Sequence, residues 1–497
     1  MKNKIFLNFF FILLTISFWP SINFASININ ENLISPDIFS ISLIIFFAAI
    51  IFYFFLNFFF NKKNSLIFSS VTIITFFLFG GYENLYIEIS DTIENSAKIA
   101  LIFCFLSFVS LSYCLWFFSN KFSFFLAIYS FIVFLYVPSI IRLTYNLSKE
   151  SLVQNNEEVE NINSNKDIFF LNDHNVYFII LDQYARTDIL KDILGIDNSN
   201  FLLELEKRGF LISKNSHSNY NRTGLTLSTS FNMNYYTEVN TYNNYLITSN
   251  SKTHEIFKLN SYSFVFVESG GNSEISCSGK EDYCIKSGNF SDDVALFLKM
   301  TPLWRIMRTQ TFGIYRYFES LYVLTDIDHA VKQAIKKFRN QDTNYLLFAH
   351  ILSPHEPQRF NLDCSKYLVM NPGLGDASID QYKIDLPCLN KQVINAIDYI
   401  LENDESDPII LIQSDHGISH EMKGVNNDNK LIRLKNLMTF KLPKKCRKYY
   451  YDKISPVNNM HLVFSCLTEK KPRYIEDKFF YTNKNKFELE EVTGYLN

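Results

Sequence analysis

Residues 176–186 read VYFIILDQYAR, a run of six apolar side chains that ends in the carboxylate of Asp182. A short apolar run bounded by polar residues is typical of a strand that is covered on both faces of a parallel sheet. Three further runs of this kind follow at residues 264–267, 345–352 and 409–413. The sequence therefore predicts a largely parallel sheet whose first strand ends in an acidic residue.

Amphipathic stretches lie between these strands, at residues 199–209, 326–339 and 389–403. In the last of them Val393 and Ile397 recur at helical spacing and predict one apolar helix face. Strands that alternate with helices are typical of an α/β domain with a central parallel sheet covered by helices. In such sheets functional residues gather at the carboxyl edge of the strands.

The first third of the chain holds most of the apolar excess. Its uncharged apolar runs cover residues 5–19, 38–60, 65–79, 99–118 and 122–141. Each is within reach of the roughly 20 residues that cross a bilayer as a helix. We predict an α-helical membrane domain of about five helices over residues 1–142, a polar linker over 143–174 and a folded domain over 175–497.

Charge gives the orientation of the predicted helices. Lysines mark one side of the bundle, namely Lys2, Lys4, Lys62, Lys63 and Lys121. The loops at 20–37 and 82–97 carry mainly Glu and Asp, so the lysine side should face the cytoplasm. The chain after Arg142 then emerges on the other side, even if the first run is instead a cleaved signal peptide. We expect a multi-pass protein of a bacterial-type inner (cell) membrane, with its C-terminal domain on the periplasmic or extracellular side.

Cysteine usage agrees with an exported domain. Six of the eight cysteines follow the helices, namely Cys277, Cys284, Cys364, Cys388, Cys446 and Cys466. An even number in an oxidising compartment predicts three disulfides, and we favour sequential pairing because the first two cysteines bracket a short polar loop. The formal net charge of -3 gives no basic footprint, so nucleic acid is not expected as a partner.

Ligand-type residues end three of the predicted strands. Asp182 ends the first, the run at 345–352 leads into His350 and His355, and the last run ends in Asp415 and His416 before Gly417. Parallel strands would bring these side chains to one edge of the sheet. Asp and His offer the mixed oxygen and nitrogen donors that suit Zn²⁺ or Mn²⁺. Each residue alone has a structural alternative, such as a helix N-cap for the first aspartate.

The segment at residues 219–230 reads NYNRTGLTLSTS and is dense in hydroxyl groups. It predicts a loop that enters a helix, capped by Thr223 or Thr226. Backbone N–H groups and the dipole at a helix start favour an anion, and a divalent metal would lower the pKa of a hydroxyl there. Thr223 is thus the candidate nucleophile.

Together these motifs resemble the sulfatase-like transferases of the alkaline-phosphatase superfamily, which include phosphoethanolamine transferases and lipoteichoic acid synthases. The resemblance implies an alkaline-phosphatase-like fold for the extracytoplasmic domain, with membrane helices before it. It implies that Asp182, Thr223, Asp415 and His416 hold the metal and that Thr223 is the catalytic nucleophile. It implies that His355 lies near the substrate and orients the phosphate or protonates the leaving oxygen.

The function implied is metal-dependent transfer of a phosphoryl-linked headgroup, of phosphoethanolamine or phosphoglycerol type. The donor would be a membrane phospholipid, the acceptor a glycan or lipid, and the intermediate a phospho-threonine. We expect one divalent ion and not two, because Gln183 and not an acidic residue follows Asp182. Zn²⁺ or Mn²⁺ is the first candidate, and Mg²⁺ or Ca²⁺ is the second. Arg186 and His350 are further substrate-binding candidates, each with a structural role as its alternative.

Two other functions stay open. One is a phosphodiester or sulfate ester hydrolase of the same superfamily; the sulfate ester activity is disfavoured because no Cys-x-Pro-x-Arg type motif surrounds Thr223. The other is a non-catalytic membrane binding module that keeps the fold. A missing metal ligand would favour the binding module, but all four expected positions carry competent residues.

Overall fold

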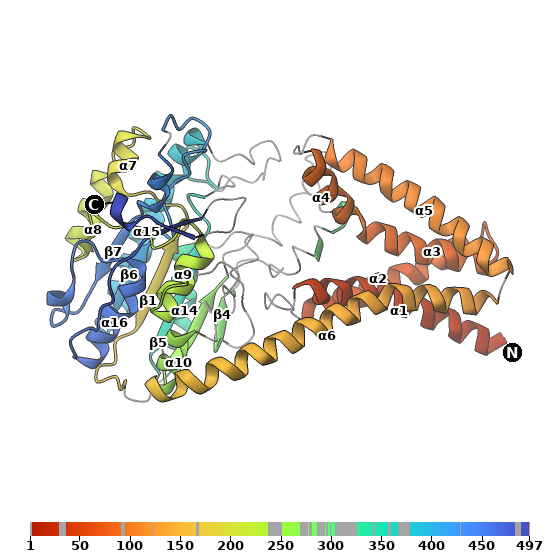
Figure 1. Ribbon diagram of the computed structural model, residues 1–497, viewed down its shortest axis with the longest axis horizontal. Helices are drawn as coiled ribbons and strands as arrows, with labels where there is room; N and C mark the ends of the chain where they lie inside the picture. The colour runs from red at the N-terminus through yellow and green to blue at the C-terminus, as the bar shows by residue number, and fades with distance from the viewer. Residues whose placement is uncertain are drawn as a thin grey trace. The chain divides into compact units, whose positions relative to one another are not determined.

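The computed structural model (Figure 1) divides into two compact units, which we call the membrane unit and the sheet unit. The membrane unit comprises Met1–Asn155 and Phe290–Phe318, and the sheet unit comprises Asn156–Asn289 and Glu319–Asn497. The structure describes residues 2–28, 36–90, 95–121, 123–165, 168–236, 251–268, 277, 281–285, 294, 297–298, 300–303, 326–339, 341, 343–355, 359–365, 378–427, 429–482 and 489–496.

Long apolar helices build the membrane unit. They are α1 (Lys2–Asn28), α2 (Pro36–Leu56), α3 (Lys62–Phe77), α4 (Phe79–Ser90), α5 (Ser96–Lys121) and α6 (Phe124–Asn165). Within the described residues, five stretches are long and apolar enough to cross a membrane, which confirms the prediction of about five helices. The third stretch, Lys62–Ile87, is longer than the predicted run because α4 continues directly from α3.

Contacts inside the membrane unit agree with the charge pattern of the sequence. The ammonium group of Lys63, at the start of α3, donates hydrogen bonds to the carbonyl of Ser119 at 3.0 Å and to Asn120 Oδ1 at 2.6 Å. The start of α3 and the end of α5 therefore lie at the same end of the bundle. This is the end on which the sequence places Lys62, Lys63 and Lys121.

A segment from the C-terminal part of the chain belongs to the membrane unit, which was not predicted. Phe297 is fully buried, with its ring 5.6 Å from that of Phe24 and 5.1 Å from that of Phe77. Gly80 N donates a hydrogen bond to the carbonyl of Met300 at 3.0 Å. The described residues near Phe297 thus pack on α1 and α3, although they come from the stretch expected to be purely extracytoplasmic.

The sheet unit is built around a seven-stranded sheet with the order β2-β7-β6-β1-β5-β3-β4. The strands are β1 (Val176–Leu181), β2 (Leu211–Ile212), β3 (Ser263–Val267), β4 (Tyr283–Ile285), β5 (Tyr345–Ile351), β6 (Ile409–Gln413) and β7 (Met438–Lys441). Strands β6, β1, β5, β3 and β4 are parallel, whereas β7 and β2 pair antiparallel at one edge. The predicted parallel sheet and its four apolar strands are confirmed.

Helices cover both faces of this sheet (Figure 1). Tyr177, Ile179 and Leu181 of β1 are fully buried in a cluster on one face, while Phe178 and Ile180 are buried on the other. The first face packs on α7 (Thr187–Asp192), α8 (Ser199–Lys207), α14 (Ile327–Phe338) and α15 (Ile379–Asn403). The second packs on α9 (Thr223–Asn232), α10 (Lys252–Leu259) and α16 (Asn459–Thr468). The alternation of side chains along each strand explains the two cores.

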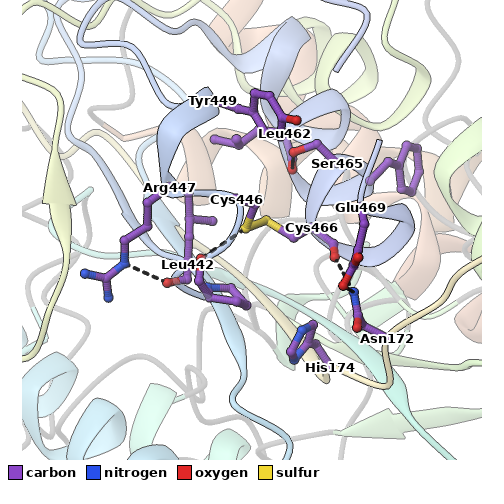
Figure 2. The surroundings of a disulfide bond; sticks show 12 residues. Asn172, His174, Leu442, Cys446, Arg447, Tyr449, Leu462, Ser465, Cys466 and Glu469 are labelled. Carbon is purple, nitrogen blue, oxygen red and sulfur yellow. Dashed lines mark hydrogen bonds between the residues drawn. A yellow bond between two sulfur atoms is a disulfide. The ribbon is translucent and has the colours of Figure 1, made fainter. Parts of the chain in front are cut away.

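The three disulfides pair in sequence order, as predicted: Cys277–Cys284, Cys364–Cys388 and Cys446–Cys466. The last one joins the segment that follows β7 to α16 (Figure 2). Next to it, the side-chain amide of Asn172 donates to the carbonyl of Cys466 at 2.9 Å. The segment before β1 and the segment after β7 are thus both tied to α16.

The stretch expected as a linker over 143–174 begins as helix, since α6 continues through Asn165. The short elements that complete the sheet unit are η4 (Lys430–Leu434), η5 (Arg447–Tyr449), η6 (Pro456–Asn458), β8 (Phe480–Thr482), β9 (Leu489–Glu491) and η7 (Thr493–Tyr495). Of these, η4 contributes to the site described next.

Candidate metal centre

The three predicted strand ends meet because β1 lies between β5 and β6 in parallel register. Asp182 follows β1 directly, and Asp415 and His416 follow β6. Each of these three residues offers one ligand atom, and the three atoms lie within 4.8 Å of one another. All three side chains are buried, with exposed fractions of 2% or less. The sequence-predicted ligands are thus brought together.

Thr223 lies at the first position of α9, with its hydroxyl against this cluster. The hydroxyl donates a hydrogen bond of 2.5 Å to Asp415 Oδ2, and its oxygen lies 3.4 Å from His416 Nε2. The predicted passage from loop to helix is confirmed, but the cap prediction is wrong, because the N-cap is Arg222 and neither Thr223 nor Thr226. A hydroxyl that donates a hydrogen bond to a neighbouring carboxylate is in the arrangement that activates a poor nucleophile.

Backbone groups hold the Asp415 side chain from the other direction. Gln183 N donates to Asp415 Oδ1 at 3.1 Å, and Gln183 has a φ of 64°, in the left-handed region. Gly417 is needed because another backbone segment approaches it closely, and not because its own φ is positive. A Cβ at Gly417 would lie 2.4 Å from the carbonyl oxygen of Lys435, and Gly417 N donates to the carbonyl of Arg433 at 2.7 Å.

The ring of His416 is oriented by its neighbours. Its Nδ1 lies 2.9 Å from the carbonyl of Gly417, to which it donates, so Nε2 keeps its lone pair. Arg433 donates a hydrogen bond of 3.2 Å to that Nε2. Burial, and then the nearby Arg433 charge, lower the pKa of His416, so the neutral ring that metals bind is favoured.

Asp182 has an unsatisfied acceptor in this cluster. Its Oδ1 is buried and has no hydrogen-bond partner among the described residues, and its Oδ2 lies 3.4 Å from His350 Nε2. Burial alone would raise the pKa of Asp182, but His355, His350 and His416 together hold it well below its usual range. A buried anionic oxygen without a partner costs free energy unless a cation satisfies it. Two carboxylates, one imidazole and one hydroxyl therefore fit a divalent metal ion.

Both histidines of the β5 end lie at this site. His350 is fully buried on β5, where it pairs in register with Ile180 of β1. His355 is half-buried, and its backbone N donates to the carbonyl of Asp182 at 3.2 Å. The next two residues of the quoted Ser-Pro-His-Glu-Pro motif, Glu356 and Pro357, lie outside the described residues.

Arg186 is engaged in an ion pair instead of pointing free into the metal cluster. Its guanidinium donates two hydrogen bonds to Asp188, of 2.7 and 2.8 Å, and a third to the carbonyl of Ser216 at 2.8 Å. Asp188 is not a member of the ligand group of the described residues. Arg433, by contrast, contacts the site although no motif in the sequence marks it.

No protein-family model matches the chain, and no curated protein matches it. Among solved structures, the chain is similar to the C-terminal periplasmic domain of EptC from Escherichia coli in complex with zinc, at 13% identity and a TM-score of 0.44. That match covers 64% of this chain and 93% of the other. A second is the lipoteichoic acid synthase LtaP from Listeria monocytogenes, at 11% identity and a TM-score of 0.41, covering 65% and 82%.

A third similar structure is the C-terminal periplasmic domain of the phosphoethanolamine transferase EptC from Campylobacter jejuni. The identity is 11%, the TM-score is 0.38, and the match covers 61% of this chain and 96% of the other.

Proposed function

We propose that this chain is a membrane-anchored, metal-dependent phosphotransferase of the alkaline-phosphatase superfamily. It moves a phosphoryl-linked headgroup of phosphoethanolamine or phosphoglycerol type from a phospholipid to a glycan or lipid acceptor. One observation carries this proposal: the Thr223 hydroxyl donates to Asp415 beside a buried group of metal-type ligands. Asp182, Thr223, Asp415 and His416 would hold one divalent ion, with Zn²⁺ or Mn²⁺ as the first candidates. When bound, such an ion lowers the pKa of a ligating hydroxyl and neutralises charge on phosphate oxygens.

In the first step Thr223 Oγ1 attacks the phosphorus of the donor phosphodiester. A bond forms between Oγ1 and phosphorus while the bond from phosphorus to the lipid oxygen breaks. The threonine proton passes to Asp415 Oδ2, the acceptor of the hydroxyl's hydrogen bond. His355 in its protonated form gives a proton to the departing lipid alcohol. The start of α9 favours the anionic phosphoryl group through its free backbone N–H groups.

In the second step the acceptor hydroxyl attacks the same phosphorus, and the bond to Thr223 breaks. His355, now neutral, takes the proton of the acceptor hydroxyl, and Asp415 returns its proton to Thr223. The enzyme is thereby restored. The membrane unit supports a lipid donor, because anchoring holds the site at the surface where the lipid is concentrated.

The decisive experiment replaces the proposed nucleophile in the full-length protein in phospholipid nanodiscs. Thr223→Ala should lower turnover on the order of 10³-fold or more, because no hydroxyl remains to form the intermediate. Thr223→Ser keeps a hydroxyl and should retain measurable turnover. Mass spectrometry of the wild-type peptide that contains Thr223 should find the mass of the transferred group on that residue. Undiminished turnover of Thr223→Ala would exclude this mechanism.

The same preparation separates transfer from hydrolysis. When the acceptor is present, a transferase should form more labelled acceptor than free headgroup phosphate. A phosphodiester or sulfate ester hydrolase should release the headgroup at the same rate with and without the acceptor. A non-catalytic membrane binding module would give neither product and no modified Thr223.

A further inference from the structure

A cavity with a volume of about 370 Å³ lies in the sheet unit. Its walls carry three basic side chains, those of Arg186, Lys435 and Lys453. The aromatic rings of Phe479 and Tyr495 also line the cavity. None of the metal-centre residues Asp182, Thr223, Asp415 and His416 lines it, so the cavity is a site of its own.

Only part of the positive charge of this cavity is paired with carboxylates. Asp188 accepts both hydrogen bonds of the Arg186 fork and lies 3.5 Å from the ammonium of Lys435, so one carboxylate serves two cations. Asp477 also lines the cavity. Lys453 is exposed and has no ion pair within the part of the chain that the structure describes. Asp452, which accepts from the amide of Asn215 at 2.6 Å, also lies near the wall, so the charge offered to a ligand is that of the Lys453 ammonium and not a net excess of cations.

The carboxylate of Asp477 is already occupied by neutral donors of the protein. It accepts from the hydroxyl of Tyr451 at 2.6 Å, from the amide of Asn458 at 2.9 Å and from the hydroxyl of Ser455. Asp477 therefore has little capacity left to accept a hydrogen bond from a ligand. The available donors of the cavity are the ammonium groups of Lys435 and Lys453.

Uncharged polar and aromatic groups surround the cations. His217 is buried, and burial together with Arg186 and Lys435 lowers its pKa to about 3, so the ring is neutral. Its ring lies 5.3 Å from that of Phe479. Tyr495 is 75% exposed at the cavity, and the side-chain amides of Asn215 and Asn429 also line it. Exposed aromatic faces and amides suit the C–H faces and hydroxyls of a sugar, while the ammonium groups suit a phosphate.

The cavity is connected to the metal centre through shared backbone. Arg186 follows Asp182 by four residues, and Arg186 N donates to the carbonyl of Lys435 at 3.1 Å. Lys435 in turn follows Arg433, which donates to His416 and, at 2.9 Å, to the carbonyl of Asn221. One segment, residues 429–436, therefore forms a wall of the cavity and supports the ligand His416.

We propose that this cavity binds a sugar phosphate carried by the acceptor, and so holds the acceptor next to the metal centre. The acceptor role rests on the proposed transfer function, whereas the binding of a sugar phosphate does not depend on it. Lys453 and Lys435 contact the phosphate, and Tyr495 lies against the sugar ring.

The test measures binding of glucose 1-phosphate to the full-length protein in detergent by calorimetry. Lys453→Gln should weaken binding about tenfold, or about 1.4 kcal/mol. Lys444→Gln, which changes another exposed lysine that does not line the cavity, should leave the binding unchanged. Glucose and inorganic phosphate, the two halves of the probe, should each bind at least tenfold more weakly. Equal binding by either half, or no effect of Lys453→Gln, would overturn the proposal.

Two further arms identify the source of the phosphate and separate the two proposals. Glycerol 3-phosphate represents a lipid headgroup, and binding tighter than that of glucose 1-phosphate would assign the cavity to the donor and overturn the acceptor role. Thr223→Ala should bind glucose 1-phosphate as the wild type does. If the wild type binds the probe but never modifies Thr223, the transfer function fails while the sugar-phosphate site stands.

Discussion

Gly417 is the residue whose substitution most directly tests the packing of the metal centre. A Cβ there would lie 2.4 Å from the carbonyl oxygen of Lys435 and 2.8 Å from that of Ile432, and backbone atoms cannot move aside as a flexible side chain can. Gly417→Ala should therefore destabilise the protein by about 1–3 kcal/mol. It should also displace His416 and lower zinc affinity. Urea unfolding and zinc titration measure the two effects.

Gly494→Ala is the matched control, because no atom beyond its chain neighbours lies within 4 Å of the position that its Cβ would take. It should change neither unfolding nor zinc binding. If Gly417→Ala behaves like this control, the close approach of the 429–436 segment does not constrain the site.

The residues of the site divide into those that a sequence can reveal and those that it cannot. Asp182, Asp415 and His416 were predictable because each ends an apolar strand, and parallel strands end at one edge. Arg433 was not, since its contact with His416 depends on how η4 folds back across the site. The hydrogen bond from Gln183 N to Asp415 could not be predicted either, because a backbone N–H group leaves no signature in the sequence.

At the scale of elements, long buried segments were predicted well and short edge segments were missed. Strands β1 and β6 have the predicted bounds, because runs of six and four consecutive apolar residues leave little ambiguity. β2 has two residues and pairs only with β7, so its pattern carries almost no signal. Helix α15 begins ten residues earlier than the predicted 389 and contains Pro387, a residue that argues against a helix interior when only the sequence is known.

The disulfide between Cys446 and Cys466 should contribute measurably to the sheet unit. It links two cysteines 20 residues apart, and both are buried against α16 and the segment after β7. Closing a loop of this length restricts the unfolded chain and is worth about 3 kcal/mol. The double variant Cys446→Ala and Cys466→Ala should lose stability of that order in urea unfolding followed by far-ultraviolet circular dichroism.

Cys104→Ala serves as the control for that pair, since Cys104 is a free cysteine of the membrane unit. It removes one sulfur without removing a cross-link, so the unfolding midpoint of the sheet unit should stay unchanged. Equal midpoints for the double variant and the control would mean that the cross-link adds nothing to the folded state.

At the scale of the whole molecule, the two units can be followed separately by their own signals. The sheet unit ranges contain no tryptophan, whereas Trp19 and Trp116 belong to the membrane unit. Tryptophan fluorescence therefore reports on the membrane unit. Hydrogen exchange at the amides of β1, β5 and β6 reports on the sheet unit, because these strands carry the metal-centre residues at their ends.

Removal of the metal should affect only one of these signals. A ligand that binds only the folded state stabilises it by about 2.7 kcal/mol at a concentration 100 times its dissociation constant. Chelation of the full-length protein should thus accelerate exchange in β1, β5 and β6 and stop turnover, and added zinc should reverse both. The tryptophan transition should not move, since all the proposed ligands belong to the sheet unit. A shift of the tryptophan transition alone would place the bound metal in the membrane unit and contradict the assignment of Asp182, Asp415 and His416.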